Sequence, residues 1–196
     1  MTFCASVSSI LHAGATPVLA EIDPKIFNID PQQLERKITP KTRALLVVHF
    51  SGRPCDMDSI LDIVDRHNLI LIEDCAHALE SRYKEREIGT FGNFGCFSFY
   101  VTKNLVTGEG GMVLTQDATD ASRIKNLALH GMSSDAWKRY SDAGFKHYYV
   151  LEAGYKYNMT DLQASWAFIS YSALRRIGQF VKRSVDVTRK SSATYL

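Results

Sequence analysis

The sequence has little of what marks several easily recognised classes of protein. Lysine and arginine number 23 against 21 aspartates and glutamates, so neither nucleic acid nor an anionic membrane is the expected main partner. No apolar run approaches the roughly 18 residues needed to span a bilayer. The first basic residue is Lys25, so the opening lacks the charged start of a signal peptide. With 45% hydrophobic residues the chain is expected to be a globular, cytoplasmic protein.

Short motifs for metal and nucleotide binding are missing too. The four cysteines, at positions 4, 55, 75 and 96, form no C-x-x-C and no paired metal spacing. We expect reduced thiols, although the sequence leaves a disulfide open. The glycine-rich turn TGEGG at 107–111 is neither a Walker P-loop nor a G-x-G-x-x-G fingerprint. Its glycines can simply provide the positive φ of a hairpin turn.

What the sequence does contain is an alternation of apolar runs and helical patterns. Residues 43–50 and 69–76 are apolar runs typical of buried strands, and 57–68 between them has apolar residues at helical spacing. Asp30 is an expected helix N-cap, and a helix break is allowed at Gly178. Further expected strands lie at 16–22, 95–100 and 110–115, and further expected helices at about 31–38, 120–129 and 159–182. This order predicts an α/β fold with helices layered on a mostly parallel sheet.

Polar side chains follow the buried run at 69–72. In such sheets ligands bind at the carboxyl ends of strands, which directs attention to Glu73, Asp74 and His77. A carboxylate there needs a positive or hydrogen-bonding partner. From position alone, Asp74 is as readily a helix cap or ion-pair partner as a catalyst, and His77 is more readily a packing residue.

Ser98 and Lys103 lie in the next expected strand and the loop after it. Read alone, Lys103 is an ordinary loop lysine. Read with Asp74 and Ser98, it completes a set that pyridoxal 5'-phosphate (PLP) requires: an amine for a Schiff base, an acid for the pyridine nitrogen and a hydroxyl for the phosphate.

Four ordered motifs extend this set across nearly the whole chain. They are EDCAHALES, GTFGNFGCFSFYVTKNLVTGEGGMVLT, NLALHGMSSDAWKRY and GYKYNMTDLQAS, preceded by TFCAS and by GATPVLAEID…TRALLVVHFSGRPCDMDSI. Together they resemble the DegT/StrS-type nucleotide-sugar aminotransferases. The resemblance implies the three-layer α/β/α large domain of a PLP-dependent transferase.

The resemblance also implies roles for individual residues. Lys103 would form the Schiff base, Asp74 would pair with the pyridine nitrogen, His77 would contact the ring hydroxyl and Ser98 would bind the phosphate. Lys103 separates the chain from the related sugar dehydratases, which carry histidine there.

Two further residues match the family pattern at the edges of the site. Phe3 corresponds to the aromatic residue that stacks on the pyridine ring. Lys156 corresponds to a residue, asparagine in many relatives, that reaches the phosphate from a neighbouring subunit. The implied assembly is a homodimer with a shared active site.

The implied reaction transfers an amino group from an amino acid, with glutamate as the expected donor, to a nucleotide-linked keto-sugar. Two alternatives stay open: a non-catalytic remnant serving as a binding or assembly module, and another PLP-dependent reaction such as sugar dehydration or a lyase reaction. His49 and His130 are expected to be structural. Residues 137–140 are expected to line the substrate side or a subunit contact.

The family pattern also includes a segment before TF, with a Gly-Thr turn, and a smaller C-terminal domain. By this comparison residues 1–158 are expected to be the core of the PLP-binding large domain. Residues 159–196 are expected to be a helical segment leading toward the small domain.

Overall fold

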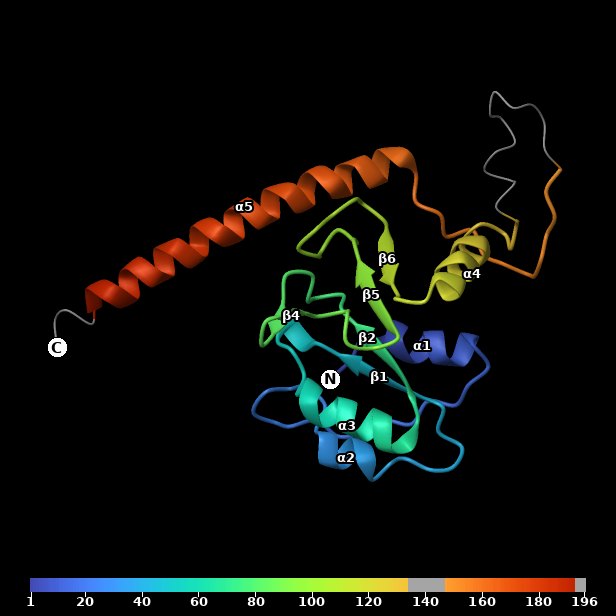
Figure 1. The fold of residues 1–196 in the computed structure, drawn as a ribbon, viewed down its shortest axis with the longest axis horizontal. Helices are drawn as coiled ribbons and strands as arrows, with labels where there is room; N and C mark the ends of the chain where they lie inside the picture. Colours follow the sequence, from blue (N-terminus) through green and yellow to red (C-terminus); the bar gives the residue numbers. More distant parts are fainter. Residues whose placement is uncertain (134–146, 193–196) are drawn as a thin grey trace.

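A four-stranded mixed sheet forms the centre of the molecule (Figure 1). The computed structural model describes residues 1–133 and 147–192, with side chains in the last helix described as far as Arg176. The strands, in spatial order, are β1 (Ala44–Val48), β2 (Ile70–Asp74), β5 (Phe94–Ser98) and β6 (Gly111–Leu114). The first three run parallel and β6 runs antiparallel to β5. The predicted α/β fold with a mostly parallel sheet is confirmed.

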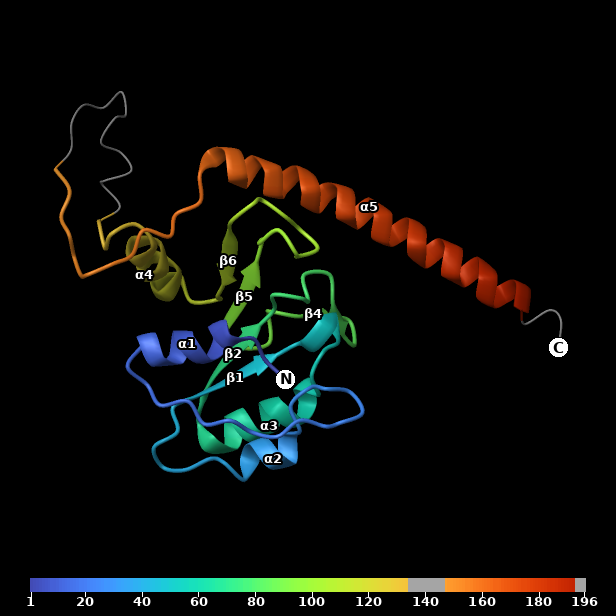
Figure 2. The same ribbon diagram turned by 180° about the vertical axis from the view of Figure 1, so that it is seen from behind.

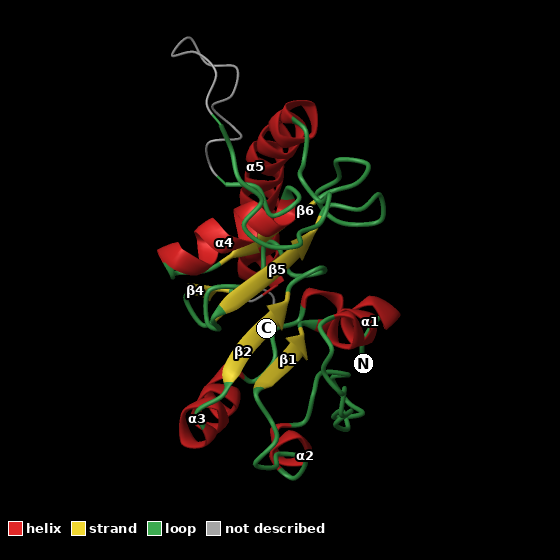
Figure 3. Cartoon of the chain, turned by 90° about the vertical axis from the view of Figure 1, so that its right-hand side faces the viewer, coloured by secondary structure: helices red, strands yellow, loops and turns green. Residues whose placement is uncertain are grey.

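Helices lie on both faces of this sheet and beyond it (Figure 2 and Figure 3). They are α1 (Cys4–His12), α2 (Pro31–Glu35), the short 3-10 helix η1 (Phe50–Gly52), α3 (Met57–His67), α4 (Ala118–Ala128) and α5 (Asp161–Ser192). A two-stranded hairpin, β3 (Arg82–Tyr83) and β4 (Arg86–Glu87), follows β2. Helix α1 lies on one side of the sheet and α3 with α2 on the other (Figure 3). Helix α4 lies beside β6, and α5 extends away from the sheet (Figure 2). Among the described residues, no helix combines the length and the apolar character needed to cross a membrane.

The core lies between the sheet and α3. Side chains alternate between the two faces of a strand, so Leu45 and Val47 on β1 share one face with Leu71 on β2, and all three are buried. Helix α3 packs against this face with an apolar stripe of Ile60 and Ile63. The opposite face of the same strands is only partly buried.

Most predicted elements are present with shorter bounds, but the expected strand at 16–22 is wrong. Only Ile22 pairs, in an isolated bridge with Ile29, while Val18 and Leu19 remain 66% and 68% exposed. A strand requires a neighbour for its backbone hydrogen bonds, and no other strand in the described part of the chain pairs with this segment. The predicted cap at Asp30 is confirmed, since its carboxylate accepts from the backbone N–H of Gln32. Helix α5 continues past Gly178 without a break.

Helix α3, which packs against this core, is delimited by side-chain chemistry at both ends. Asp56 accepts hydrogen bonds from the N–H and Oγ of Ser59 and from the hydroxyl of Tyr83. At the other end Asn68 adopts a left-handed conformation (φ 49°, ψ 55°), which stops the helix before β2. The cap therefore fixes where α3 begins, and with it the fit of α3 to the sheet.

Replacing Asp56 by alanine is expected to lower the free energy of unfolding by about 1 to 2 kcal/mol, because the cap bonds and the Tyr83 contact are lost together. Urea unfolding followed by circular dichroism measures the change. Asp56→Asn keeps a capping oxygen and should recover most of the loss. An alanine variant as stable as the unmodified chain would contradict the capping role.

Candidate functional site

The register of β2 and β5 places Asp74 and Ser98 on the same face of the sheet. Asp74 lies opposite Cys96 in the ladder, and Ser98 follows two residues later on β5. Two residues advance a strand by roughly 6.6 Å and neighbouring strands lie roughly 4.8 Å apart, so the two Cα atoms are about 8 Å apart. This face is the one covered by α1, opposite the α3 core (Figure 3).

The Asp74 carboxylate is held by donors from two directions. Its Oδ2 accepts a hydrogen bond from Ser6 Oγ at 2.8 Å, and its Oδ1 accepts from the backbone N–H of Ala76 at 3.1 Å. Each carboxylate oxygen can accept about two hydrogen bonds, so acceptor capacity remains on both oxygens. Phe3, the N-cap residue of α1, is 72% exposed one helical turn before Ser6. An acid and an exposed aromatic ring thus lie at the same end of α1.

Lys103 lies just beyond the carboxyl end of β5, in the loop that returns to β6. Its backbone N–H donates to the carbonyl oxygen of Tyr100 at 2.9 Å, and its side chain is half-buried. The loop is fixed by buried Thr107, whose Oγ1 donates to the carbonyl oxygen of Glu109 at 2.8 Å. Gly108 takes the positive φ of 80° that its place in the turn requires. The lysine is therefore carried by a structured connection at the edge where β2 and β5 end.

The remaining candidates are His77 and Lys156. His77 is exposed three residues after Asp74, and its ring meets that of Phe50 edge-on at 6.5 Å. Lys156 is exposed; its Nζ donates to Asn158 Oδ1 and its backbone pairs with Leu129. None of the hydrogen bonds or ion pairs described for Lys156 joins it to another candidate residue of the same chain.

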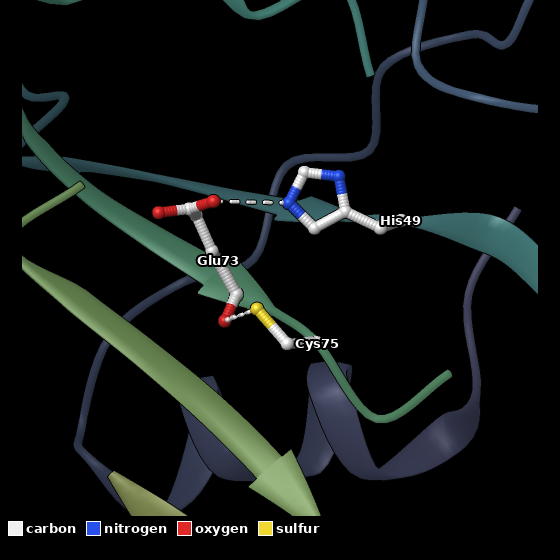
Figure 4. A group of neighbouring side chains, drawn as sticks. All are labelled: His49, Glu73 and Cys75. Atoms are coloured by element: carbon white, nitrogen blue, oxygen red, sulfur yellow. Dashed lines mark hydrogen bonds and ion pairs between the residues drawn. The ribbon is translucent and has the colours of Figure 1, made fainter. Parts of the chain in front are cut away.

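A second polar cluster, of His49, Glu73 and Cys75, lies on the opposite, buried face (Figure 4). Glu73 Oε2 accepts from His49 Nε2 at 3.1 Å and from Gly89 N–H at 2.9 Å, and Oε1 accepts from the N–H groups of Phe91 and Gly92. All four acceptor positions of the carboxylate are filled. The cluster is therefore a structural bridge between β1, β2 and the turn before β5, and it does not offer the carboxylate to a metal ion.

The orientation of the His49 ring follows from its two partners. Nδ1 accepts from the backbone N–H of Cys55 at 3.1 Å, so the ring proton lies on Nε2 and is donated to Glu73. Burial raises the pKa of the Glu73 carboxyl, but the hydrogen bonds from His49, Gly92 and Gly89 lower it by more. The pKa of this carboxyl therefore lies below its usual range. A charged carboxylate bonded to a neutral ring is the result, which agrees with the structural role expected for His49.

The four cysteines are free. Burial is the main cause that raises the pKa of the Cys55 thiol to about 12.

A hollow of about 600 Å³ lies at the amino-terminal ends of β1 and β2, lined by residues of 38–43 and 67–69. It is at the opposite edge of the sheet from Lys103 and contains none of the candidate residues. His130 follows α4 with a φ of 58° and donates its backbone N–H to Tyr155. The segment 137–140 lies outside the described residues.

The sequence and the fold both match known proteins. The model of the DegT/DnrJ/EryC1/StrS aminotransferase family matches residues 1–191. The chain belongs to this family. Curated proteins that it resembles include the spore coat polysaccharide biosynthesis protein SpsC of Bacillus subtilis, 46% identical over all of this chain and 49% of the relative. The GDP-perosamine synthase of Caulobacter vibrioides is 38% identical over 91% of this chain and 45% of the relative. The chain thus spans about half the length of the curated relatives it matches.

Solved structures, among them that of the sugar aminotransferase Spr1654, have the same fold. Spr1654 of Streptococcus pneumoniae, solved in a PLP-form, aligns with a TM-score of 0.80 at 31% identity, over 93% of this chain and 50% of its own. DesI, solved in the presence of its TDP-sugar product, aligns with a TM-score of 0.75 at 35% identity, over 90% of this chain and 42% of its own. These matches confirm the predicted family and its α/β fold.

Sequence reasoning did not single out Ser6. The available signal was its place in TFCAS, three residues after Phe3, where a helix beginning at position 4 turns it to the same side as the aromatic residue. The bond from Ser6 to Asp74 spans 68 residues of sequence, so only the fold reveals it.

Proposed function

We propose that the chain provides the PLP-binding site of an aminotransferase that transfers an amino group, with glutamate as donor, to a nucleotide-linked keto-sugar. The observation that carries the proposal is the arrangement of Asp74 and Ser98 on one face of the sheet, with Lys103 beyond the end of the same strand as Ser98. Family membership and the PLP-form of Spr1654 support the cofactor, and the TDP-sugar product in whose presence DesI was solved supports the substrate class.

The residues of this chain fit the cofactor. Bound PLP would supply an electron-accepting pyridinium ring, which lets an amino group be exchanged. Asp74 would hold the ring nitrogen protonated, using the acceptor capacity that Ser6 and Ala76 leave on its carboxylate. Ser98, about 8 Å away along the same face, would donate its hydroxyl to the phosphate.

Other residues complete the proposed site. Lys103 would hold the cofactor by a Schiff base and move the proton at the reacting carbon once its amine is free. The exposed ring of Phe3 would stack on the pyridine face, and His77 would contact the ring hydroxyl. Lys156, which is exposed, would donate to the phosphate of the PLP held by a partner chain, in a cytoplasmic homodimer.

The domain assignment is part of the same proposal. Residues 1–158 would be the core of the PLP-binding large domain, and 159–196 would lead toward a small domain. Helix α5 supports this division, because it extends away from the sheet and carries exposed apolar side chains at Trp166, Phe168 and Ile169 (Figure 2).

The test is the first half of the reaction, which needs no sugar. The purified chain loaded with PLP is mixed with glutamate, and we expect about one equivalent of 2-oxoglutarate per bound PLP, because the amino group passes to the cofactor. Enzymatic detection of 2-oxoglutarate measures it, and protein without PLP is the control. Bound PLP with no 2-oxoglutarate would contradict the aminotransferase and favour a binding or assembly module. Analysis of the product formed from a keto-sugar nucleotide separates amination from dehydration.

A further inference from the structure

Ser6 differs from the other residues of α1 because its side chain is buried. It is 8% exposed, and its hydroxyl points across the structure to Asp74 Oδ2 at 2.8 Å. A buried hydroxyl needs a partner, and serine is a weaker helix former than alanine. The hydroxyl therefore has a specific partner in the acid of the proposed cofactor site.

Ser6 also connects that acid to Phe3. The backbone N–H of Ser6 donates to the carbonyl oxygen of Phe3 at 3.2 Å, in the first turn of α1. The other side-chain oxygen of Asp74 accepts from Ala76, two residues away on the same segment. Among the described residues, Ser6 is thus the side chain that ties the Asp74 carboxylate to a separate element.

We propose that Ser6 is a positioning residue for Asp74: its hydroxyl fixes the orientation of the carboxylate and stabilises its charged form, so that a proton stays on the pyridine nitrogen. This inference rests on the proposed function. Hydrogen bonds donated to a carboxylate favour its ionised state, and those to charged groups are among the stronger ones. Ser6 acts through Asp74 and does not itself touch the cofactor.

The inference predicts two coupled changes in Ser6→Ala. The dissociation constant of PLP rises about tenfold, because the carboxylate loses one of its two donors. The pH midpoint of the visible PLP absorption band also moves up, by about half a pH unit. In Ser6→Ala the proton shared between Asp74 and the pyridine ring of PLP would shift toward Asp74, so the ring would carry less positive charge. The nitrogen that joins Lys103 to PLP would then keep its own proton to a higher pH.

Two thiols lie close enough to Asp74 to feel its charge, and neither explains such a shift. Burial, and then the charge of Asp74, raise the pKa of Cys96. Burial and the charges of Glu73, Cys96 and Asp74 raise the pKa of Cys75. Both thiols stay protonated through the neutral range in which the band would be followed.

The experiment compares the full chain with Ser6→Ala, Ser6→Thr and Ser9→Ala, each loaded with PLP. Absorbance titrations give the dissociation constant and the pH midpoint, and thermal unfolding without PLP reports folding. Threonine keeps the hydroxyl and should restore both values. Ser9 is exposed on the same helix and donates to the Ser6 carbonyl oxygen, so Ser9→Ala should leave both values unchanged.

The outcomes are distinct. Weaker binding together with the raised midpoint in Ser6→Ala, and recovery in Ser6→Thr, support the inference. An unchanged pH midpoint in Ser6→Ala overturns the inference, even if PLP binding weakens or the variant unfolds at a lower temperature. Weaker binding or lower stability alone would follow from a merely structural role of Ser6. If the midpoint is unchanged in Ser6→Ala but the visible band of the unmodified chain disappears in Lys103→Ala, the inference about Ser6 fails and the proposed function stands. No band in the unmodified chain overturns both proposals.

Discussion

Replacing Lys103 by alanine is expected to abolish covalent attachment of PLP and to slow 2-oxoglutarate formation from glutamate by at least about a thousandfold. The half-buried lysine lies at the edge of the sheet where β2 and β5 end, on a loop fixed at Thr107 and Gly108. Alanine removes both the amine that would hold the cofactor and the group that would carry the proton. Borohydride reduction followed by mass spectrometry measures the attachment, and rapid mixing with glutamate measures the rate.

Two other lysines make this result specific. Lys125 is exposed on α4, so Lys125→Ala should retain full attachment and rate. Lys156→Ala should weaken PLP binding without abolishing attachment, since that lysine is proposed to donate to the phosphate of a partner chain. A Lys103→Ala variant that still carries covalently reduced PLP would refute the assignment of Lys103.

The layered fold was predictable because the relevant signals are local. The apolar runs at 43–50 and 69–76 and the helical spacing at 57–68 depend only on nearby residues, and all three appear as β1, β2 and α3. The segment 16–22 has the composition of a strand as well, but a strand forms only where a neighbour accepts its hydrogen bonds. That condition is set by the whole fold and cannot be read from composition.

The candidate site was predictable only in part, for a related reason. Glu73 and Asp74 are consecutive acids at the end of one strand, and alternation sends their side chains to opposite faces. The family resemblance identified Asp74, whereas residue type alone could not say which acid faces a ligand. The partners of the two acids, Ser6 and His49, are 68 and 24 residues away, and they are defined only once the strands have paired.

The buried acid, Glu73, gives the largest expected effect on stability. Glu73→Ala should lower the free energy of unfolding by about 3 to 5 kcal/mol, because His49 and three backbone N–H groups would lose their buried acceptor. The turn at 89–92 would also lose its attachment to β2. Urea unfolding of the chain without PLP measures the effect. An alanine variant within about 1 kcal/mol of the unmodified chain would contradict the bridging role.

The pH dependence of this effect has a definite sign. The pKa of Glu73 is lowered in the folded state, against the effect of burial, by hydrogen bonds from His49, Gly92 and Gly89. Its contribution to stability is therefore fully present above the ordinary carboxyl value of 4.5 and is lost as the pH falls through the lower folded value.

Glu73→Gln has nearly the same shape but no charge to lose. It should be less stable than the unmodified chain at neutral pH, and the difference between the two should narrow as the pH falls below about 4.5. Glu85→Gln, at an exposed position, should instead follow the unmodified chain at every pH. If the difference between Glu73→Gln and the unmodified chain stayed constant down to pH 3, the Glu73 carboxylate would not be the charged acceptor that joins β1, β2 and the turn before β5.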